Sequence, residues 1–248
     1  VQVEPASGTT IMGYAGIVNG NNLAPNGDDY FHHASIVQIQ DYLETTACAV
    51  STNIGNSPPS VSSLSNYVIP KGTPFVLTAN AVDTDGDMLT YAWEQIDNGI
   101  VVTSTFGPEN ISGANFRSLP PTTAQERYFP NLNQVLNGNL EQENPAINTS
   151  WETVSNVQRE LNFALTVRDN NTEGGQVSSD SLKVEVVSSA GPFQVTSQNA
   201  NEIYIAGSVQ EITWDVANTN QLPINTESVS IWLSTDGGNN FSELLAND

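Results

Sequence analysis

The two side chains best suited to bind a zinc ion are His32 and His33, the only histidines among the 248 residues. A helix that holds zinc through two histidines needs them four positions apart, so that both imidazoles lie on one face. Adjacent helical positions point about 100° apart instead, and the sequence contains no HExxH motif. We therefore expect both histidines to lie at the surface or to cap a helix. A zinc site made of one histidine and carboxylates is the less favoured alternative.

Three aspartates, Asp83, Asp85 and Asp87, alternate around Gly86 in a turn-like segment. Calcium prefers several carboxylate and carbonyl oxygens, and aspartates at alternate positions of a turn can converge on one ion. An EF-hand loop is excluded, because Met88 occupies the sixth position, where glycine is required. We favour a structural turn in which the carboxylates accept hydrogen bonds from nearby backbone amides. A calcium site formed by the three aspartates is the alternative.

No other combination of side chains stands out as a catalytic set. The histidines are adjacent and Cys48 follows a predicted helix, so no serine or cysteine nucleophile has a credible base partner. A carboxylate pair for glycoside hydrolysis stays open, because acidic residues are abundant and none is singled out. Aromatic side chains could stack on sugars, although tryptophans in alternating strands usually belong to a core. The aromatic residues are Tyr91, Trp93, Tyr128 and Trp214, and the N-glycosylation sequons, a weak pattern, are at Asn110, Asn148, Asn170 and Asn240.

Residues 4–16, EPASGTTIMGYAG, form a glycine-rich turn around Met12. This segment resembles the Met-turn of secreted bacterial reprolysin-like zinc metallopeptidases, which are metzincins. In that family a preceding helix with HExxHxxGxxH supplies the zinc ligands and a general base, and the methionine packs beneath the metal as an adaptable apolar floor. The resemblance implies that Met12 supports the ligands and that Gly13, Tyr14 and Ala15 border the substrate pocket. The alternative is an ordinary turn with a buried methionine.

Further motifs follow in the order that this family leads one to expect. Residues 28–43 resemble the lead-in and last helix of the peptidase domain, and residues 83–95 and 161–170 resemble two motifs of PKD- or Ig-like modules. The resemblance implies the C-terminal part of a secreted zinc endopeptidase that acts on proteins, with the zinc ligands outside this chain. We expect the chain alone to be inactive. Its β domains would position the substrate or bind a cell surface or polysaccharide. The main alternative is an extracellular adhesive or carbohydrate-binding β-sandwich protein stabilised by calcium.

Charge and composition narrow the class of partner. The formal net charge is −21, from 27 acidic residues against 6 lysines and arginines. Nucleic acids and anionic membrane surfaces both require basic residues, so neither is expected as a partner. No apolar run approaches the roughly 20 residues that span a bilayer. Cys48 is the only cysteine, so a disulfide within the chain is excluded and we expect a free, buried thiol.

One helix is predicted near the N-terminus. Ser35 and Gln38 have the spacing of a capping box, and Ile36, Ile39 and Leu43 follow at helical intervals of three and four. The helix is short and could hardly be stable by itself. We expect another part of the protein to cover its apolar face.

The remainder of the chain shows β patterns. Alternating apolar residues and Gly/Asp/Asn turns predict a mainly β fold: an Ig/PKD-like antiparallel β-sandwich, preceded by the Met-turn and helix remnant and followed by an incomplete second β-sandwich. The expected domains are residues 1–56, 57–190 with a long insertion around 103–156, and 191–248. Within the insertion, Phe129 to Leu136 could form a short helix. The strands are expected around Phe75–Ala79, Leu89–Trp93, Leu161–Val167, Leu182–Val186, Ile203–Ile205, Ile212–Trp214 and Val229–Leu233, with a hairpin turn at 234–241.

Overall fold

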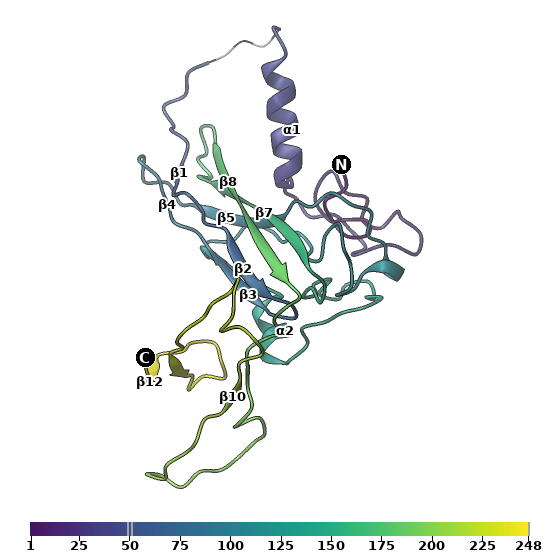
Figure 1. Cartoon of the computed structure of the whole chain (residues 1–248). Helices are drawn as coiled ribbons and strands as arrows, with labels where there is room; N and C mark the ends of the chain where they lie inside the picture. The colour runs from purple at the N-terminus through teal and green to yellow at the C-terminus, as the bar shows by residue number, and fades with distance from the viewer. Residues whose placement is uncertain (49, 51, 248) are drawn as a thin grey trace.

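The computed structural model describes residues 1–48, 50 and 52–247, and Figure 1 shows α1 projecting away from a central group of sheets. The elements follow one another in the order α1 (His33–Glu44), β1 (Ser60–Val61), β2 (Tyr67–Pro70), β3 (Phe75–Thr78), β4 (Ala81–Val82), β5 (Thr90–Gln95), β6 (Glu126–Phe129), α2 (Leu132–Leu136), β7 (Arg159–Arg168), β8 (Val177–Val187), β9 (Gln194–Val195), β10 (Trp214–Asp215), β11 (Ile231–Leu233) and β12 (Glu243–Ala246). None of the described helices is long and apolar enough to span a membrane.

The largest sheet has four strands in the order β2-β8-β7-β5. Strand β7 pairs antiparallel with β5 and β8, whereas β2 runs parallel to β8. The β3–β6 pair faces this sheet, and aromatic rings join the two layers: the centroid of Phe163 on β7 lies 4.7 Å from that of Phe129 and 5.7 Å from that of Phe75. The predicted mainly β fold with antiparallel sheets is therefore confirmed, with the parallel β2 as an addition.

The period-two patterns hold where a strand faces the core. In β7 the alternate residues Leu161, Phe163, Leu165 and Val167 are all buried. In β8 Leu182, Val184 and Val186 are buried, and the residues between them are partly exposed. Each such strand has one face against the opposite layer, which is why alternation in the sequence predicted it.

The predicted helix exists, but it begins two residues before Ser35. His32 is the N-cap, and its Nδ1 accepts a hydrogen bond of 3.1 Å from the amide of Ala34. The capping box at Ser35 and Gln38 is therefore wrong, because both residues lie inside the helix. The prediction that the histidines lie at the surface or cap a helix is confirmed for His32, which is the cap and has a buried side chain.

The apolar face of α1 is uncovered. No residue of the helix is buried, and Ile39, Tyr42 and Leu43 are exposed. Cys48, just beyond the helix, is a free and exposed thiol, so the expectation of burial is wrong. Cys48 follows the end of α1, the helix that projects from the body of the protein in Figure 1, and the described residues next to it in the sequence are largely exposed.

The insertion has little regular secondary structure, but several of its side chains are buried in the core. The predicted short helix is present as α2, although Phe129 belongs to β6 instead. Phe116 joins the aromatic core between the sheets, and Trp151 is fully buried in a second cluster. The insertion therefore packs as part of the domain.

Residues from 191 onward form two small sheets, β9–β10 and β11–β12. The predicted turn between β11 and β12 is confirmed, with positive φ angles at Gly237 and Gly238. The strand expected at Ile203 and Ile205 is wrong, because both side chains are exposed and lie in a loop. Among the described residues of this region only Thr219 is buried, so the region has no closed core.

Candidate functional site

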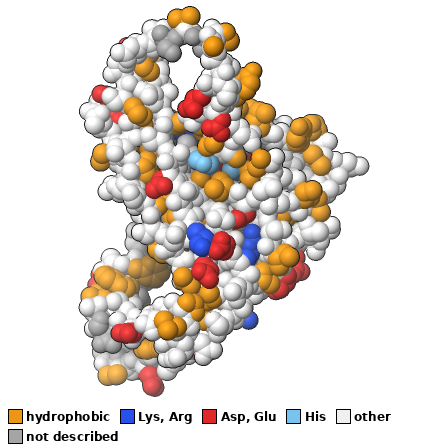
Figure 2. Space-filling model, turned by 45° about the horizontal axis from the view of Figure 1, so that its top comes forward, with side chains coloured by type: hydrophobic (Ala, Val, Ile, Leu, Met, Phe, Trp, Pro, Cys, Tyr) orange, Lys and Arg blue, Asp and Glu red, His pale blue; other side chains and the backbone are white. Residues whose placement is uncertain are grey.

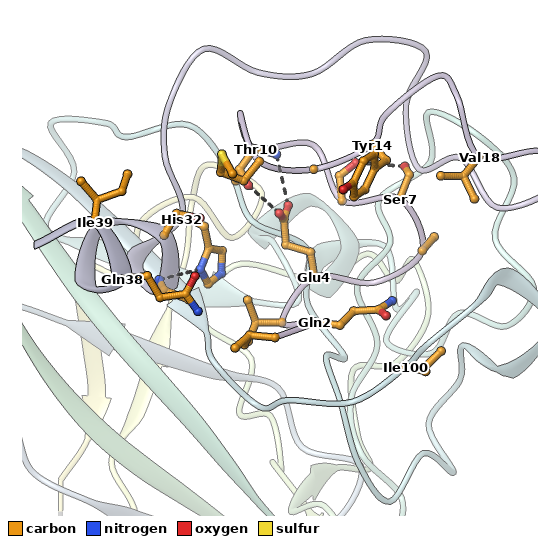
Figure 3. Close-up of a pocket in the computed structure, with 18 of the residues that line it drawn as sticks. Gln2, Glu4, Ser7, Thr10, Tyr14, Val18, His32, Gln38, Ile39 and Ile100 are labelled. Atoms are coloured by element: carbon orange, nitrogen blue, oxygen red, sulfur yellow. Dashed lines mark hydrogen bonds between the residues drawn. The ribbon is translucent and has the colours of Figure 1, made fainter. Parts of the chain in front are cut away.

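Residues 7–14, which we term the Met12 turn, are held by the carboxylate of Glu4. Its Oε1 accepts hydrogen bonds from the amides of Thr9 (2.9 Å) and Thr10 (3.3 Å), and its Oε2 accepts one from the Thr10 hydroxyl (2.5 Å). The turn is closed by the amides of Gly13 and Tyr14, which donate to the carbonyls of Thr10 (2.7 Å) and Ser7 (2.8 Å). Figure 3 shows the Glu4 carboxylate pointing at Thr10 from beneath. The partly buried carboxylate of Glu4 thus fixes the shape of the turn.

Met12 is 63% exposed and lines a cavity instead of belonging to a core. This cavity, which we term the α1 groove, has a volume of about 700 Å³ and lies between the Met12 turn and α1. Gly13 and Tyr14 line it too, whereas Ala15 is not among its described lining residues. The alternative prediction, an ordinary turn with a buried methionine, is therefore wrong, because Met12 is exposed.

The walls of the α1 groove are largely apolar and come from three parts of the chain. The N-terminal segment contributes Val1 and Val3, the exposed face of α1 contributes Ile39, Tyr42 and Leu43, and the sandwich contributes Ile100 and Val102. In Figure 2, histidine atoms (pale blue) lie beside hydrophobic side chains (orange), with acidic side chains (red) close above them. A concave apolar surface of this size is typical of a site for a ligand or another protein segment.

Both histidines attach the start of α1 to the sandwich. The amide of His33 donates to Oε2 of Glu94 at 2.7 Å, and its Nδ1 lies 3.3 Å from the hydroxyl of Thr166. Nε2 of His32 lies 3.9 Å from Oε1 of Glu94. Within the described residues, neither histidine belongs to a group of three side chains that could hold a metal ion.

Glu94 is the centre of this contact, and sequence reasoning missed it. Its side chain is fully buried, and it accepts hydrogen bonds from the Ser118 hydroxyl and the His33 amide. The hydroxyl of Tyr30 donates to Ser118 Oγ at 2.7 Å, and burial raises the pKa of Tyr30 well above its ordinary value. Strand alternation puts Glu94 on the outer face of β5, where a charged residue is ordinary. Residues 30–33 and Ser118, which are distant in the sequence, contact this side chain and bury it.

A second contact joins the N-terminal segment to the insertion and to the residues just before it. Leu23 packs with Val101, Phe106 and Trp151 in a buried cluster, and the amide of Ala6 donates to the carbonyl of Val101 at 2.7 Å. The N-terminal segment and the sandwich therefore share buried apolar surface as well as a buried carboxylate.

The aspartate turn has the predicted structural form. Oδ1 of Asp83 accepts hydrogen bonds from the amides of Asp85 (2.8 Å) and Asp87 (3.2 Å). The carboxylate of Asp85 accepts a bond of 2.7 Å from the amide of Ser57. Asp85 does not share a site with the other two. The residues that meet are Asp83, Asp87 and the buried Asp169, which we term the carboxylate cluster.

The aromatic residues considered for sugar binding have different environments. Tyr91 and Trp93 are buried in the sandwich core, as expected for tryptophan in an alternating strand, and Tyr128 is half-buried. Trp214 is 39% exposed and stacks on Phe193 with a centroid distance of 6.1 Å.

The partly buried position of His33 predicts a pH-dependent stability. Burial lowers its pKa from the ordinary value of 6.5, an effect that the nearby Glu94 partly offsets. As the pH falls from above 6.5 through the folded-state pKa, the unfolded chain takes up a proton that the folded chain does not, so the His33 contribution to stability is lost. In urea unfolding experiments, we expect the free energy of unfolding to fall from pH 7.5 to pH 5.5. In a His33→Gln variant this fall should be smaller; an equal fall in both proteins would contradict the prediction.

Comparison with known proteins gives one family. Residues 1–43 match the model of the reprolysin-like metallo-peptidase family M12B, a stretch that contains the Met12 turn and nearly all of α1. No curated protein and no solved structure matches the chain. The N-terminal segment is thus similar to reprolysin-like metallopeptidases, and the match does not extend to the sandwich.

Proposed function

We propose that this chain is the C-terminal part of a secreted zinc-dependent endopeptidase that acts on proteins, and that it has no peptidase activity alone. The observation that carries the proposal is the family match over residues 1–43, which coincides with an exposed methionine in a tightly held turn beside an apolar groove. In such enzymes zinc activates a water molecule and polarises the scissile carbonyl. The described residues of this chain bring no set of histidine ligands together, so the ligands would come from a preceding segment.

In this proposal the chain provides the lower part of the active site. Met12 would support the zinc ligands from beneath, and Gly13, Tyr14 and Ala15 would border the substrate pocket. Glu4 would act through the turn, because it accepts three hydrogen bonds from Thr9 and Thr10 and so holds Met12 in place. In all these roles the residues would hold the zinc ligands and the substrate in position and would take no part in the chemical step.

The α1 groove would be filled by the preceding part of the peptidase domain. Helix α1 has no buried residue, and isolated helices of this length are marginally stable in water. Covering Ile39, Tyr42 and Leu43 with apolar side chains would stabilise the helix and remove a large apolar surface from solvent. The sandwich would then be joined rigidly to the peptidase domain through Glu94 and the Trp151 cluster, and would position the substrate or bind a cell surface or polysaccharide.

The covering of α1 can be tested with Leu43→Asp. In the 248-residue chain we expect this substitution to change the free energy of unfolding by less than about 0.5 kcal/mol, because Leu43 is 56% exposed. In the full-length protein it should lower zinc-dependent peptidase activity or protein stability strongly, because the charge would be buried in the groove. Chemical denaturation of both proteins and a casein-cleavage assay measure the two effects.

The matched control is Gln40→Asp, which places the same charge on an exposed position of α1 outside the groove. It should be nearly neutral in both proteins. Two results would overturn the proposal: equal effects of the two substitutions in the full-length protein, or zinc-dependent peptidase activity of the 248-residue chain alone.

The alternative from another class is an extracellular adhesive or carbohydrate-binding β-sandwich protein with calcium as a stabilising ion. The carboxylate cluster is the observation that favours it. The segment encoded upstream of Val1 separates the two: an HExxHxxGxxH motif within about a hundred residues supports the peptidase, and its absence removes that proposal.

A further inference from the structure

Two adjacent residues of the insertion, Arg117 and Ser118, make polar contacts with the N-terminal segment. Nη2 of Arg117 donates to the hydroxyl of Thr9 at 3.3 Å and lies 3.7 Å from Oδ2 of Asp28. Ser118 accepts the hydrogen bond of 2.7 Å from the hydroxyl of Tyr30. Thr9, Tyr30 and Ser118 are buried, and the Arg117 side chain is only 16% exposed. These contacts therefore lie in the interior, where hydrogen bonds are stronger than in water.

The contacted residues belong to two neighbouring pieces of backbone, one of which is the Met12 turn. The amide of Asp28 donates to the carbonyl of Thr9 at 2.5 Å, and the amide of Ile11 donates to the carbonyl of Tyr30 at 3.0 Å. Ile11 comes directly before the methionine. The two backbone bonds thus join the Met12 turn to the piece of chain that the insertion holds.

Arg117 is itself fixed by the interior of the sandwich. Its amide donates to the carbonyl of Trp151 at 3.1 Å, and its carbonyl accepts a bond of 2.6 Å from Nη2 of Arg127. The same guanidinium forms the ion pair of 2.7 Å with the buried Glu152. Direct contacts therefore run without interruption from a buried carboxylate of the sandwich to the Met12 turn.

We propose that Arg117 is a positioning residue for the Met12 turn, so that the sandwich is part of the support of the active site and not a separable accessory module. Arg117 is absent from the described lining of the α1 groove, so it acts through Thr9 and Asp28. Glu4 holds the turn from within the N-terminal segment, and Arg117 holds it from the sandwich. The effect on peptidase activity rests on the proposed function, whereas the effect on the turn does not.

Hydrogen exchange of the 248-residue protein tests the hold on the turn. Arg117→Met keeps an unbranched side chain and removes its charge and its donors. Amide exchange in peptides covering residues 8–14 should become at least about tenfold faster, which corresponds to about 1.4 kcal/mol. Exchange in β7 reports unfolding of the whole sandwich and should change less. Unchanged exchange at residues 8–14, or an equal acceleration in β7, would overturn the proposal.

Arg168→Met is the matched control, because Arg168 also donates from the sandwich to the N-terminal segment, at the carbonyl of Phe31 (3.0 Å). Exchange at residues 8–14 should stay as in the unmodified protein, and an acceleration equal to that of Arg117→Met would show that the role is not specific to Arg117. Thr9→Val removes the acceptor of the Arg117 bond. Because both substitutions break one contact, the double variant should exchange no faster than Arg117→Met. An additive effect would overturn the route through Thr9.

The full-length protein tests the consequence for activity. Arg117→Met should lower kcat for zinc-dependent casein cleavage at least about tenfold and leave KM within about threefold, because the transition state depends on position more than substrate binding does. Arg117→Lys should restore part of kcat. An unchanged kcat, or a fall that only follows the loss of folded protein in a thermal melt, would overturn the positioning role. If the unmodified full-length protein cleaves no protein, the peptidase function fails, and the exchange experiment still decides whether Arg117 holds the turn.

Discussion

Arg127→Ala is expected to lower the free energy of unfolding by about 3–5 kcal/mol, the cost of leaving one partner of a buried ion pair uncompensated. Nη2 of Arg127 lies 2.7 Å from Oε1 of Glu152, whose side chain is 1% exposed. The guanidinium also donates to the carbonyls of Trp93 (2.5 Å) and Arg117 (2.6 Å). One side chain thus connects β5, β6 and the insertion. Urea denaturation of the 248-residue protein measures the loss.

Lys183→Ala is the matched control, because it removes a cation from a pair of the same 2.7 Å length on the surface. The side chains of Lys183 and Glu160 are 37% and 58% exposed. Exposed pairs contribute little, since water solvates both charges when the pair is broken. We expect a far smaller loss than for Arg127→Ala. Equal losses would show that burial of Glu152 is not the source of the effect.

Glu94→Ala should destabilise the protein by about 2–4 kcal/mol, because several buried groups lose their acceptor at once. The amide of His33 and the hydroxyl of Ser118 both donate to this carboxylate. The variant should also detach the start of α1 from the sandwich, so hydrogen exchange at His33 and Ala34 should become faster. Chemical denaturation and hydrogen-exchange mass spectrometry measure the two effects.

Glu160→Ala, on the neighbouring strand β7, is the control for loss of a carboxylate from the outer face of the sheet. It should leave exchange at His33 unchanged, because the Glu160 side chain is exposed and contacts Lys183. Unchanged exchange at His33 in Glu94→Ala would contradict the assignment of Glu94 as the attachment point of α1.

The β-sandwich could be predicted because its strands each have one apolar face. Alternation at Leu161–Val167 and Leu182–Val186 reports burial against a facing layer, and the structure buries the alternate residues. The pattern fails at Ile203 and Ile205, where the spacing is right but nothing in the described chain covers the side chains. Alternation of apolar residues shows only that a strand could bury one face; it does not show that another layer covers that face.

The sequence alone determined the short helix, the aspartate turn and the Met12 turn, because each depends on contacts between residues near one another in the chain. It also indicated the strands that have one apolar face. Tertiary structure alone decided which carboxylates are buried and which of them lie close together. Glu94 is buried by residues 30–33 and by Ser118, and Asp169 joins Asp83 and Asp87 although about eighty residues separate them. Charged side chains become buried or come together through packing between distant segments, and the spacing of residues in the sequence does not predict such contacts.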